Sequence, residues 1–373
     1  MNDALPLVFD GHNDVLTRLL RAGGVSAADS FADGREGHLD IARIRRGGFG
    51  GGFFAVWVPS PGDGGNYQDE MAKPAYDIPL PAPVSRDDAL HVVSAEIATL
   101  RRLESLGHVR VCTTVQAIRE CLASDTVAAV LHIEGAEAID PDLYALDALH
   151  AEGLRSLGPV WSRTTAFGHG VPFRYPSDPD IGDGLTEHGV RLVRRCNELG
   201  ILIDLSHLNA KGVDDVATHS VHPLVATHSN AHAICPHARN LTDDQLRTIA
   251  ATNGVVGLNF ATAFLRADGQ MRADTSLDTL LRHLDHLIAI LGEGGVALGS
   301  DFDGALVPEA IGDAGGLTAL RRAMREHGYD DELMTKLCHG NWLDVLERTW
   351  HGPDAAAVPG VSSGDDAASA GRV

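Results

Sequence analysis

Histidine and carboxylate residues stand at the ends of several short apolar runs of this sequence. The first run closes with His12 and Asp14, and later runs close with Glu134, His207 and His228. His12 and Asp14 are two residues apart, so on an extended chain their side chains point to the same side. Imidazole and carboxylate groups together are ligands that suit zinc and its first-row neighbours.

A third acid, Asp301, follows the last apolar run, and Asp303 comes two residues later. Taken singly, a histidine at a strand end is more often a hydrogen-bonded core residue than a ligand. Glu134 is harder to explain in this way, because an unpaired buried carboxylate is costly. Three histidines and three acids at strand ends therefore predict a metal site, with His132 as an alternative ligand on the face of Glu134.

Eight short runs rich in Val, Ile, Leu and Phe carry these residues, and amphipathic stretches separate them. The predicted strands are 7–14, 52–58, 128–134, 154–161, 201–207, 224–229, 254–260 and 296–301. Helical spacing predicts helices over 87–106, 143–151, 187–199, 214–219, 243–251 and 277–291. Eight apolar strands alternating with helices predict an α/β fold, the (β/α)8 TIM barrel. The carboxyl ends of its strands meet at one mouth, where we expect the metal site.

An open doubly wound sheet is the alternative, but it would usually carry a glycine-rich turn after its first strand, where this chain has His12 and Asp14. Two insertions, 59–83 and 167–183, follow the second and fourth predicted strands, where barrel loops carry substrate contacts. We expect residues 1–350 to form a single domain. Residues 351–373 have little to bury and are predicted to be a disordered tail.

Composition excludes several classes of partner. The 373 residues include 30 basic and 51 acidic side chains, a net charge of −21, so clustered Lys and Arg for a phosphate backbone or an anionic membrane are missing. No apolar run approaches the roughly 20 residues of a membrane span, and no signal peptide is visible. The five cysteines form no C-x-x-C pair, which indicates free thiols. We therefore expect a cytoplasmic protein that binds neither nucleic acid nor membrane.

Five separated motifs resemble one known family. They are Phe9-Asp-Gly-His-Asn-Asp14, Ile133-Glu-Gly135, Ile203-Asp-Leu-Ser-His207, Thr227-His-Ser-Asn-Ala231 with Arg239-Asn240, and Gly299-Ser-Asp-Phe-Asp-Gly304. In this order they resemble the signatures of the membrane dipeptidase (renal dipeptidase) family, among the amidohydrolase-like barrels. The resemblance runs from about residue 7 to about residue 342.

The resemblance implies a binuclear zinc hydrolase with two Zn²⁺ per chain. His12 and Asp14 would hold one ion, His207 and His228 the other, and Glu134 would bridge the two. A water between the ions would be the nucleophile, its pKa lowered by two cations.

The resemblance also implies the remaining catalytic groups and the substrate. Asp301 would accept the proton of the water and pass it to the leaving amine. Arg239 would bind the C-terminal carboxylate of the substrate. The expected activity is hydrolysis of dipeptides with a free C-terminus. The alternatives are a binuclear amidase or lactamase acting on a related small amide, and a ligand-binding barrel without catalysis. The helical segment 318–348 is a candidate homodimer face.

Two positions depart from the family pattern. Trp161 stands where many members carry a histidine at the end of the fourth strand, and Phe264 stands where many carry a tyrosine. If both side chains line the mouth, the substrate pocket is smaller and more apolar than in those members. In the alternative, Trp161 packs beneath the site and His169 takes the place of the missing histidine.

Overall fold

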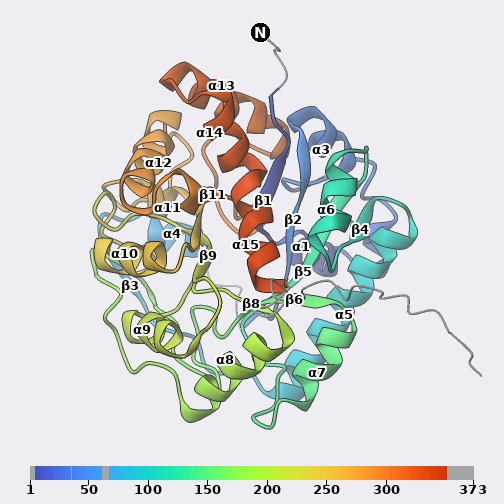
Figure 1. Ribbon diagram of the computed structural model, residues 1–373, viewed down its shortest axis with the longest axis vertical. Helices are drawn as coiled ribbons and strands as arrows, with labels where there is room; N and C mark the ends of the chain where they lie inside the picture. Colours follow the sequence, from blue (N-terminus) through green and yellow to red (C-terminus); the bar gives the residue numbers. More distant parts are fainter. Residues whose placement is uncertain (1–4, 35, 61–66, 351–373) are drawn as a thin grey trace, which may run out of the picture.

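The computed structural model describes residues 5–34, 36–60 and 67–350, and parallel strands surrounded by helices lie at its centre (Figure 1). The barrel strands are β1 (Val8–Asn13), β2 (Phe49–Trp57), β5 (Val127–Glu134), β6 (Leu154–Gly158), β8 (Leu202–Ile203), β9 (Val225–Ser229), β10 (Val255–Asn259) and β11 (Val296–Gly299). They form one sheet in the order β1-β2-β5-β6-β8 and a second in the order β11-β10-β9.

Single parallel bridges join the two sheets into a ring. Asp204, directly after β8, pairs with Val225 of β9. Asn13 of β1 pairs with Phe302, which follows β11. The predicted (β/α)8 barrel is therefore confirmed, and the open sheet is wrong. Most strand ends differ from the prediction by one to three residues, and two strands are much shorter than predicted. β6 ends at Gly158 because Pro159 has no N–H to donate. β8 has only two residues, and a single bridge at Asp204 and a turn at residues 206–207 follow it.

Helices cover the outside of the ring. The longer ones are α1 (Val15–Arg21), α3 (Ile41–Gly47), α5 (Arg86–Ser105), α6 (Val115–Leu122), α7 (Tyr144–Ala151), α8 (Glu187–Leu199), α9 (Ala210–His219), α10 (Asp243–Ala251), α12 (Leu277–Leu291), α13 (Leu317–His327) and α15 (Asn341–Trp350). Short elements are α2 (Val25–Ala28), α4 (Tyr67–Met71), α11 (Thr262–Leu265), α14 (Asp331–Thr335), η1 (Glu293–Gly295), η2 (Ala314–Gly316) and η3 (Lys336–Gly340).

Polar N-caps explain where several helices begin. The side chain of Thr186 accepts from Gly189 N at the start of α8, and Thr242 forms a capping box with Gln245 in α10. Asn209 caps α9 in the same way, so this helix begins at Ala210, earlier than predicted. Helices α1, α3 and α6 were not predicted from the sequence. Among the described residues no helix has the length and apolar character needed to cross a bilayer.

The side chain of Trp342 in α15 fills one end of the barrel interior. It is fully buried against Phe9 and Phe53 of β1 and β2, and its indole N–H donates to Leu298 O at 3.0 Å. Gly11 of β1 makes room for the ring, because a Cβ there would lie 2.6 Å from the indole. The metal-site residues lie toward the other end, since they follow the carboxyl ends of the strands.

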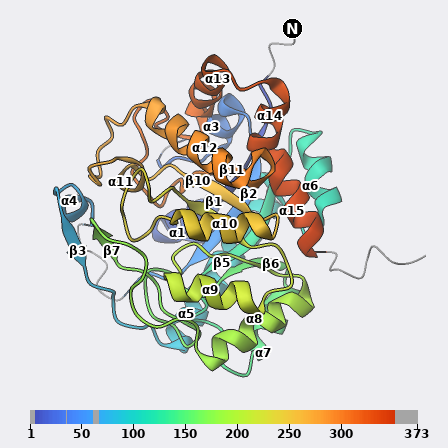
Figure 2. The same ribbon diagram turned by 60° about the vertical axis from the view of Figure 1, so that its left-hand side comes forward.

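The two predicted insertions meet each other beside the mouth. β3 (Tyr76–Ile78) pairs antiparallel with β7 (Phe173–Tyr175), and Figure 2 shows α4 next to this small sheet at one edge of the molecule. The small sheet packs on Phe264 and Met271. β4 (Val109–Val111) adds a parallel strand along the beginning of β5. The predicted disordered tail lies outside the described residues.

Candidate active site

Glu134, the last residue of β5, lies at the centre of the predicted metal ligands. Its Oε1 is 3.1 Å from His207 Nε2 and 3.4 Å from His228 Nε2. Its Oε2 is 3.7 Å from His12 Nε2, which in turn is 3.3 Å from Asp14 Oδ2. Residues from β1, β5 and β9 and from the loop after β8 therefore meet at the carboxyl ends of the strands, as the sequence predicted.

Two overlapping groups of these side chains have the geometry for metal binding. His12, Glu134 and His228 form one group, and His12, Asp14 and Asp301 form the other. Within each group the ligand atoms all lie within 4.8 Å of one another. His132, the alternative ligand, belongs to neither group. Its Nδ1 is hydrogen-bonded to Ser156 Oγ at 2.9 Å, and its ring packs edge-on against His12.

Unpaired polar atoms in the site fit bound cations. Both ring nitrogens of His12 and the Oε1 atom of Glu134 are buried without a hydrogen-bond partner among the described residues. The Nε2 atoms of His207 and His228 face each other at 3.3 Å. Buried polar atoms are normally satisfied, so atoms that converge without partners are suited to a shared ion. The residues present therefore fit a metal centre of N and O ligands.

A hydrogen bond to its other ring nitrogen, Nδ1, fixes the tautomer of His228. The hydroxyl of Thr227 donates to Asp204 Oδ2 at 2.6 Å, so its oxygen can only accept from His228 Nδ1, 2.8 Å away. The proton of His228 is thus on Nδ1, and Nε2 presents its lone pair to the site. Ser162 Oγ is likewise within hydrogen-bond distance of His207 Nδ1, at 2.8 Å.

The titrating groups are crowded. Burial lowers the pKa values of His207 and His228 well below their usual range, which favours the neutral form that binds metal. Burial also raises the pKa of Glu134, and it raises the pKa of Asp301 together with the charge of Asp14. Burial alone would lower the pKa of His12, but Glu134 and Asp14 outweigh it and raise this pKa to about 10. Burial and crowding thus disfavour the charged forms of Glu134 and Asp301, and the neighbouring carboxylates favour the charged form of His12.

Asp301 follows β11 in a strained turn at the edge of the site. Its Oδ2 accepts from Asn259 Nδ2 at 3.0 Å, which leaves Oδ1 for other contacts. The backbone φ of Asp301 is 59°, in the left-handed region that few non-glycine residues adopt. Asn259 ends β10, a strand for which the sequence suggested only Phe264, five residues further on, and no residue at the strand end itself. The strand-end rule that singled out His12 would also have found it.

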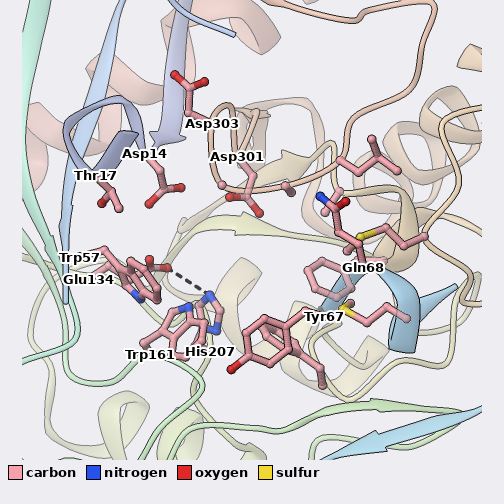
Figure 3. Close-up of a pocket in the computed structure, with 18 of the residues that line it drawn as sticks. Asp14, Thr17, Trp57, Tyr67, Gln68, Glu134, Trp161, His207, Asp301 and Asp303 are labelled. Carbon is pink, nitrogen blue, oxygen red and sulfur yellow. Dashed lines mark ion pairs between the residues drawn. The ribbon is translucent and has the colours of Figure 1, made fainter. Parts of the chain in front are cut away.

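A cavity of about 330 Å³ opens above this group (Figure 3). Asp14, Glu134, His207 and Asp301 line its floor. Its walls are largely aromatic and apolar, and they include Trp57, Tyr67, Met71, Trp161, Phe173, Phe264 and Met271. The residues of α4 come from the insertion 59–83, so the prediction that this loop reaches the site is confirmed in position. The individual α4 residues were not predicted, because no motif marks them.

Trp161 and Phe264 both stand in the cavity wall. The Trp161 ring packs edge-on against Trp57 at 5.1 Å and lies 5.8 Å from the His207 ring. Phe264 stacks with Phe173 at 5.9 Å. His169 is absent from the described lining residues and contacts Thr164 Oγ1 instead. The structure therefore places Trp161 at the mouth and not beneath it.

Arg239 is buried beside Phe264. Its Nη2 donates to His228 O at 3.2 Å and its Nη1 to Ser229 Oγ at 3.3 Å, while Nε has no partner among the described residues. Its guanidinium carbon lies 5.7 Å from the centre of the Phe264 ring. Burial lowers the pKa of Arg239 to about 10, so the group stays charged at neutral pH.

The acids near Arg239 in sequence are engaged elsewhere. Asp243 bonds to His286 and Asp244 to Arg247, and no ion pair of Arg239 occurs within the described ranges.

Fold and site together define a metal-dependent hydrolase built on a (β/α)8 barrel. The model of the protein family described as "Membrane dipeptidase (Peptidase family M19)" matches residues 4–352 of the sequence. The chain belongs to this family, and it is a metallodipeptidase, a hydrolase that acts on peptide bonds, as the sequence predicted. The hypothesis of a barrel without catalysis is thereby wrong.

Solved structures agree with this assignment. A metallopeptidase from Rhodobacter sphaeroides, liganded with a phosphinate mimic of the dipeptide L-Ala-D-Ala, is 54% identical with a TM-score of 0.91, over 93% of this chain and 100% of its own. A second solved dipeptidase of the same family is also 54% identical, with a TM-score of 0.90, over 93% of this chain and 99% of its own. A probable dipeptidase from Pseudomonas aeruginosa is 21% identical, with a TM-score of 0.72, over 85% of this chain and 90% of its own, and shares the fold.

Curated relatives extend the similarity in sequence. A Klebsiella pneumoniae protein described as uncharacterized, in the pqqA 5' region, is 47% identical over 70% of this chain and 98% of its own length. An Acinetobacter calcoaceticus protein, also described as uncharacterized, is 41% identical over 75% of this chain and 89% of its own length.

Proposed function

We propose that this metallodipeptidase cleaves dipeptides with a free C-terminal carboxylate and uses two zinc ions. The observation that carries the proposal is Glu134, whose two oxygens lie between three histidines at 3.1 to 3.7 Å on the floor of a cavity. One carboxylate between two sets of ligands is suited to bridging two ions. His12 and Asp14 would hold one ion, and His207 and His228 the other.

Zinc, when bound, supplies Lewis-acid polarisation of the scissile carbonyl and makes water a stronger acid. The chain supplies the proton transfer and the substrate contacts. Asp301 would accept the proton at Oδ1, because its Oδ2 already accepts a hydrogen bond from Asn259 Nδ2. The same carboxyl group then returns the proton to the leaving amine.

Arg239 would bind the C-terminal carboxylate of the substrate, a planar guanidinium against a planar anion. Its unpaired Nε is available for such a contact. Phe264 lines the cavity and Arg239 is absent from its described lining, so binding at Arg239 would require a movement of side chains such as Phe264. Trp161 and Phe264 make the pocket apolar, which favours small or apolar substrate side chains. The L-Ala-D-Ala mimic bound by the Rhodobacter sphaeroides relative is a ligand of that kind.

The substitution Asp301→Asn tests the proposed chemistry. Asparagine keeps the shape but cannot take a proton, so we expect turnover to fall by about 10² to 10⁴, with two zinc ions per chain retained. Turnover on a dipeptide panel and zinc content by elemental analysis are the measurements. Near-normal turnover would refute the role of Asp301, and fewer than two ions in active protein would refute the binuclear site. A small lactam or another small amide as the better substrate would favour the amidase alternative.

The dimer face on segment 318–348 and the cytoplasmic location stay predictions. The apolar side chains of that segment, such as Met324, Met334 and Leu346, are buried in the core of the chain.

A further inference from the structure

Asp303 has no part in the proposed chemistry, yet its side chain is only 1% exposed and lies between three segments. Its Oδ1 accepts from His38 N at 2.6 Å, and its Oδ2 lies 3.0 Å from Arg18 Nε in α1. Its own N–H donates to His38 Nδ1 at 2.8 Å. Arg18 also donates to Leu39 O at 2.6 Å, so it joins α1 to the segment that contains His38.

These contacts hold the turn that carries Asp301. The N–H groups of Gly304 and Ala305 both donate to Asp301 O at 3.1 Å, and Asp301 N donates to His12 O at 3.0 Å. A Cβ on Gly304 would overlap Asp14 Oδ2 and lie 2.5 Å from Asp301 Oδ1. The backbone of the turn thus packs directly onto two carboxylates of the site, and a shift of the turn would move Asp301 with it.

The turn depends on its surroundings to keep this shape, because Asp301 and Asp303 both have positive φ values, 59° and 67°. Such conformations are costly for non-glycine residues and persist only where the surroundings hold them. Figure 3 shows Asp303 set back from the metal ligands, on the far side of Asp301 from His207. Both of its oxygens are engaged by His38 and Arg18, which makes it a poor candidate for accepting the proton of the reaction.

We propose that Asp303 is a positioning residue, which holds the 301–305 turn through Arg18 and His38 so that Asp301 faces the floor of the cavity. Its effect on turnover rests on the proposed role of Asp301, whereas its effect on the turn does not.

The first variant is Asp303→Asn, which keeps the shape and removes the charge. We expect kcat to fall about 10- to 100-fold, the size expected for a misplacement of the order of 1 Å, with little change in KM and in zinc content. Amide hydrogen exchange at Gly304 and Ala305 should become faster, because the turn opens more often. Asp147→Asn is the control, since Asp147 of α7 also pairs with an arginine of another element, Arg195 of α8 at 2.8 Å, and neither residue contacts the 301–305 turn, Arg18 or His38 in the described structure. It should leave kcat and this exchange unchanged.

A double-mutant cycle tests whether Asp303 works through Arg18. If the two act as one unit, Asp303→Asn combined with Arg18→Met should lose about as much turnover as either single variant. Losses that multiply would mean independent effects and would overturn the proposal.

A matched pair of glycine variants tests the same contact without removing a charge. A Cβ on Gly37 would overlap Arg18 Nε and lie 2.5 Å from Asp303 Oδ1, whereas a Cβ on Gly34 meets its nearest atom, Asp40 Oδ2, at 3.6 Å. Both glycines have positive φ, 82° and 67°, so both alanine variants carry similar backbone strain. Gly37→Ala should lower kcat and speed exchange at residues 304 and 305, and Gly34→Ala should do neither.

The outcomes separate the two proposals. Wild-type zinc-loaded protein that cleaves no dipeptide would refute the proposed function. Exchange at Gly304 and Ala305 that is unchanged in Asp303→Asn would refute the positioning role whatever the activity. Faster exchange with unchanged kcat would also refute the positioning role, because loosening the turn would then have no effect on catalysis.

Discussion

We expect the stability of this protein to depend on pH through the buried carboxyl group of Glu96. Glu96 lies on α5 behind the cavity wall, fully buried, and its Oε2 accepts from Trp57 N at 2.8 Å while its Oε1 has no partner among the described residues. Burial raises the pKa of Glu96 from 4.5 to about 8, and the nearby Asp14 adds to the effect. We expect Glu96→Gln to remove this dependence, because the amide is neutral at every pH and keeps an oxygen for Trp57.

The sign follows from the direction of the shift. A carboxyl group whose pKa is higher in the folded state binds its proton more tightly there, so its favourable contribution is complete below about pH 4.5. That contribution is lost as the pH rises to about 8. A shift of about 3.5 pH units corresponds to about 5 kcal/mol at ~1.36 kcal/mol per unit, and this is an upper limit. The variant should equal the wild type near pH 4.5 and exceed it by up to this amount above pH 8.

Thermal and urea unfolding at pH 5 and pH 8.5 measure the difference. The metal-free protein is the sample of choice, because a cation at Asp14 would add positive charge and lower the pKa of Glu96. Glu104→Gln is the matched control, since Glu104 is on the same helix and accepts from Val111 N at 2.7 Å, but its side chain is 33% exposed. A gap between Glu96→Gln and wild type that is the same at both pH values would refute the reasoning.

Three further predictions concern the site. Arg239→Lys keeps the charge and loses the fork of N–H donors, so KM should rise for dipeptides with a free C-terminus and far less for their amides; equal effects on both would make Arg239 structural. Trp161→His should broaden the range toward polar dipeptides, because it removes a ring from the cavity wall and adds a polar group; an unchanged substrate profile with a lower Tm would make Trp161 a packing residue. Removal of zinc by a chelator should abolish turnover and lower Tm, because ligands from several strands lose a shared ion; an unchanged Tm would show that the ions do not stabilise the fold.

The barrel was predictable because its strands are almost wholly apolar and most of them are closed or closely followed by a polar residue. The residues at those ends, such as Glu134 and His228, were found by the same rule, since strand position alone brings them together. The small sheet of β3 and β7 was not predictable, because Tyr76 and Tyr175 pair across a long stretch of chain and neither strand is apolar throughout. The wall formed by α4 depends on that pairing and was missed with it.

Contacts that support the ligands were also out of reach from the sequence. Ser162 and Thr227 are common residue types, and only the folded chain shows that each contacts the Nδ1 of a particular histidine. Asp303 belongs to a recognisable motif, but its partners Arg18 and His38 are 265 or more residues away in the chain. The position of a residue along its strand thus predicted whether it reaches the site. Which residues support the predicted ligands and Asp301 depends on long-range packing, which the sequence does not show.

The indole of Trp342 has a consequence for the order of events during synthesis. It comes from the last described helix, yet it fills the slot that Gly11 of the first strand and Gly257 leave open. A growing chain therefore cannot complete the interior of its barrel until nearly the whole described length has left the ribosome. Before that point the strands that carry the metal ligands surround an unfilled apolar space, which leaves them exposed to misassembly. Maturation of the metal site is thus expected to follow synthesis of α15.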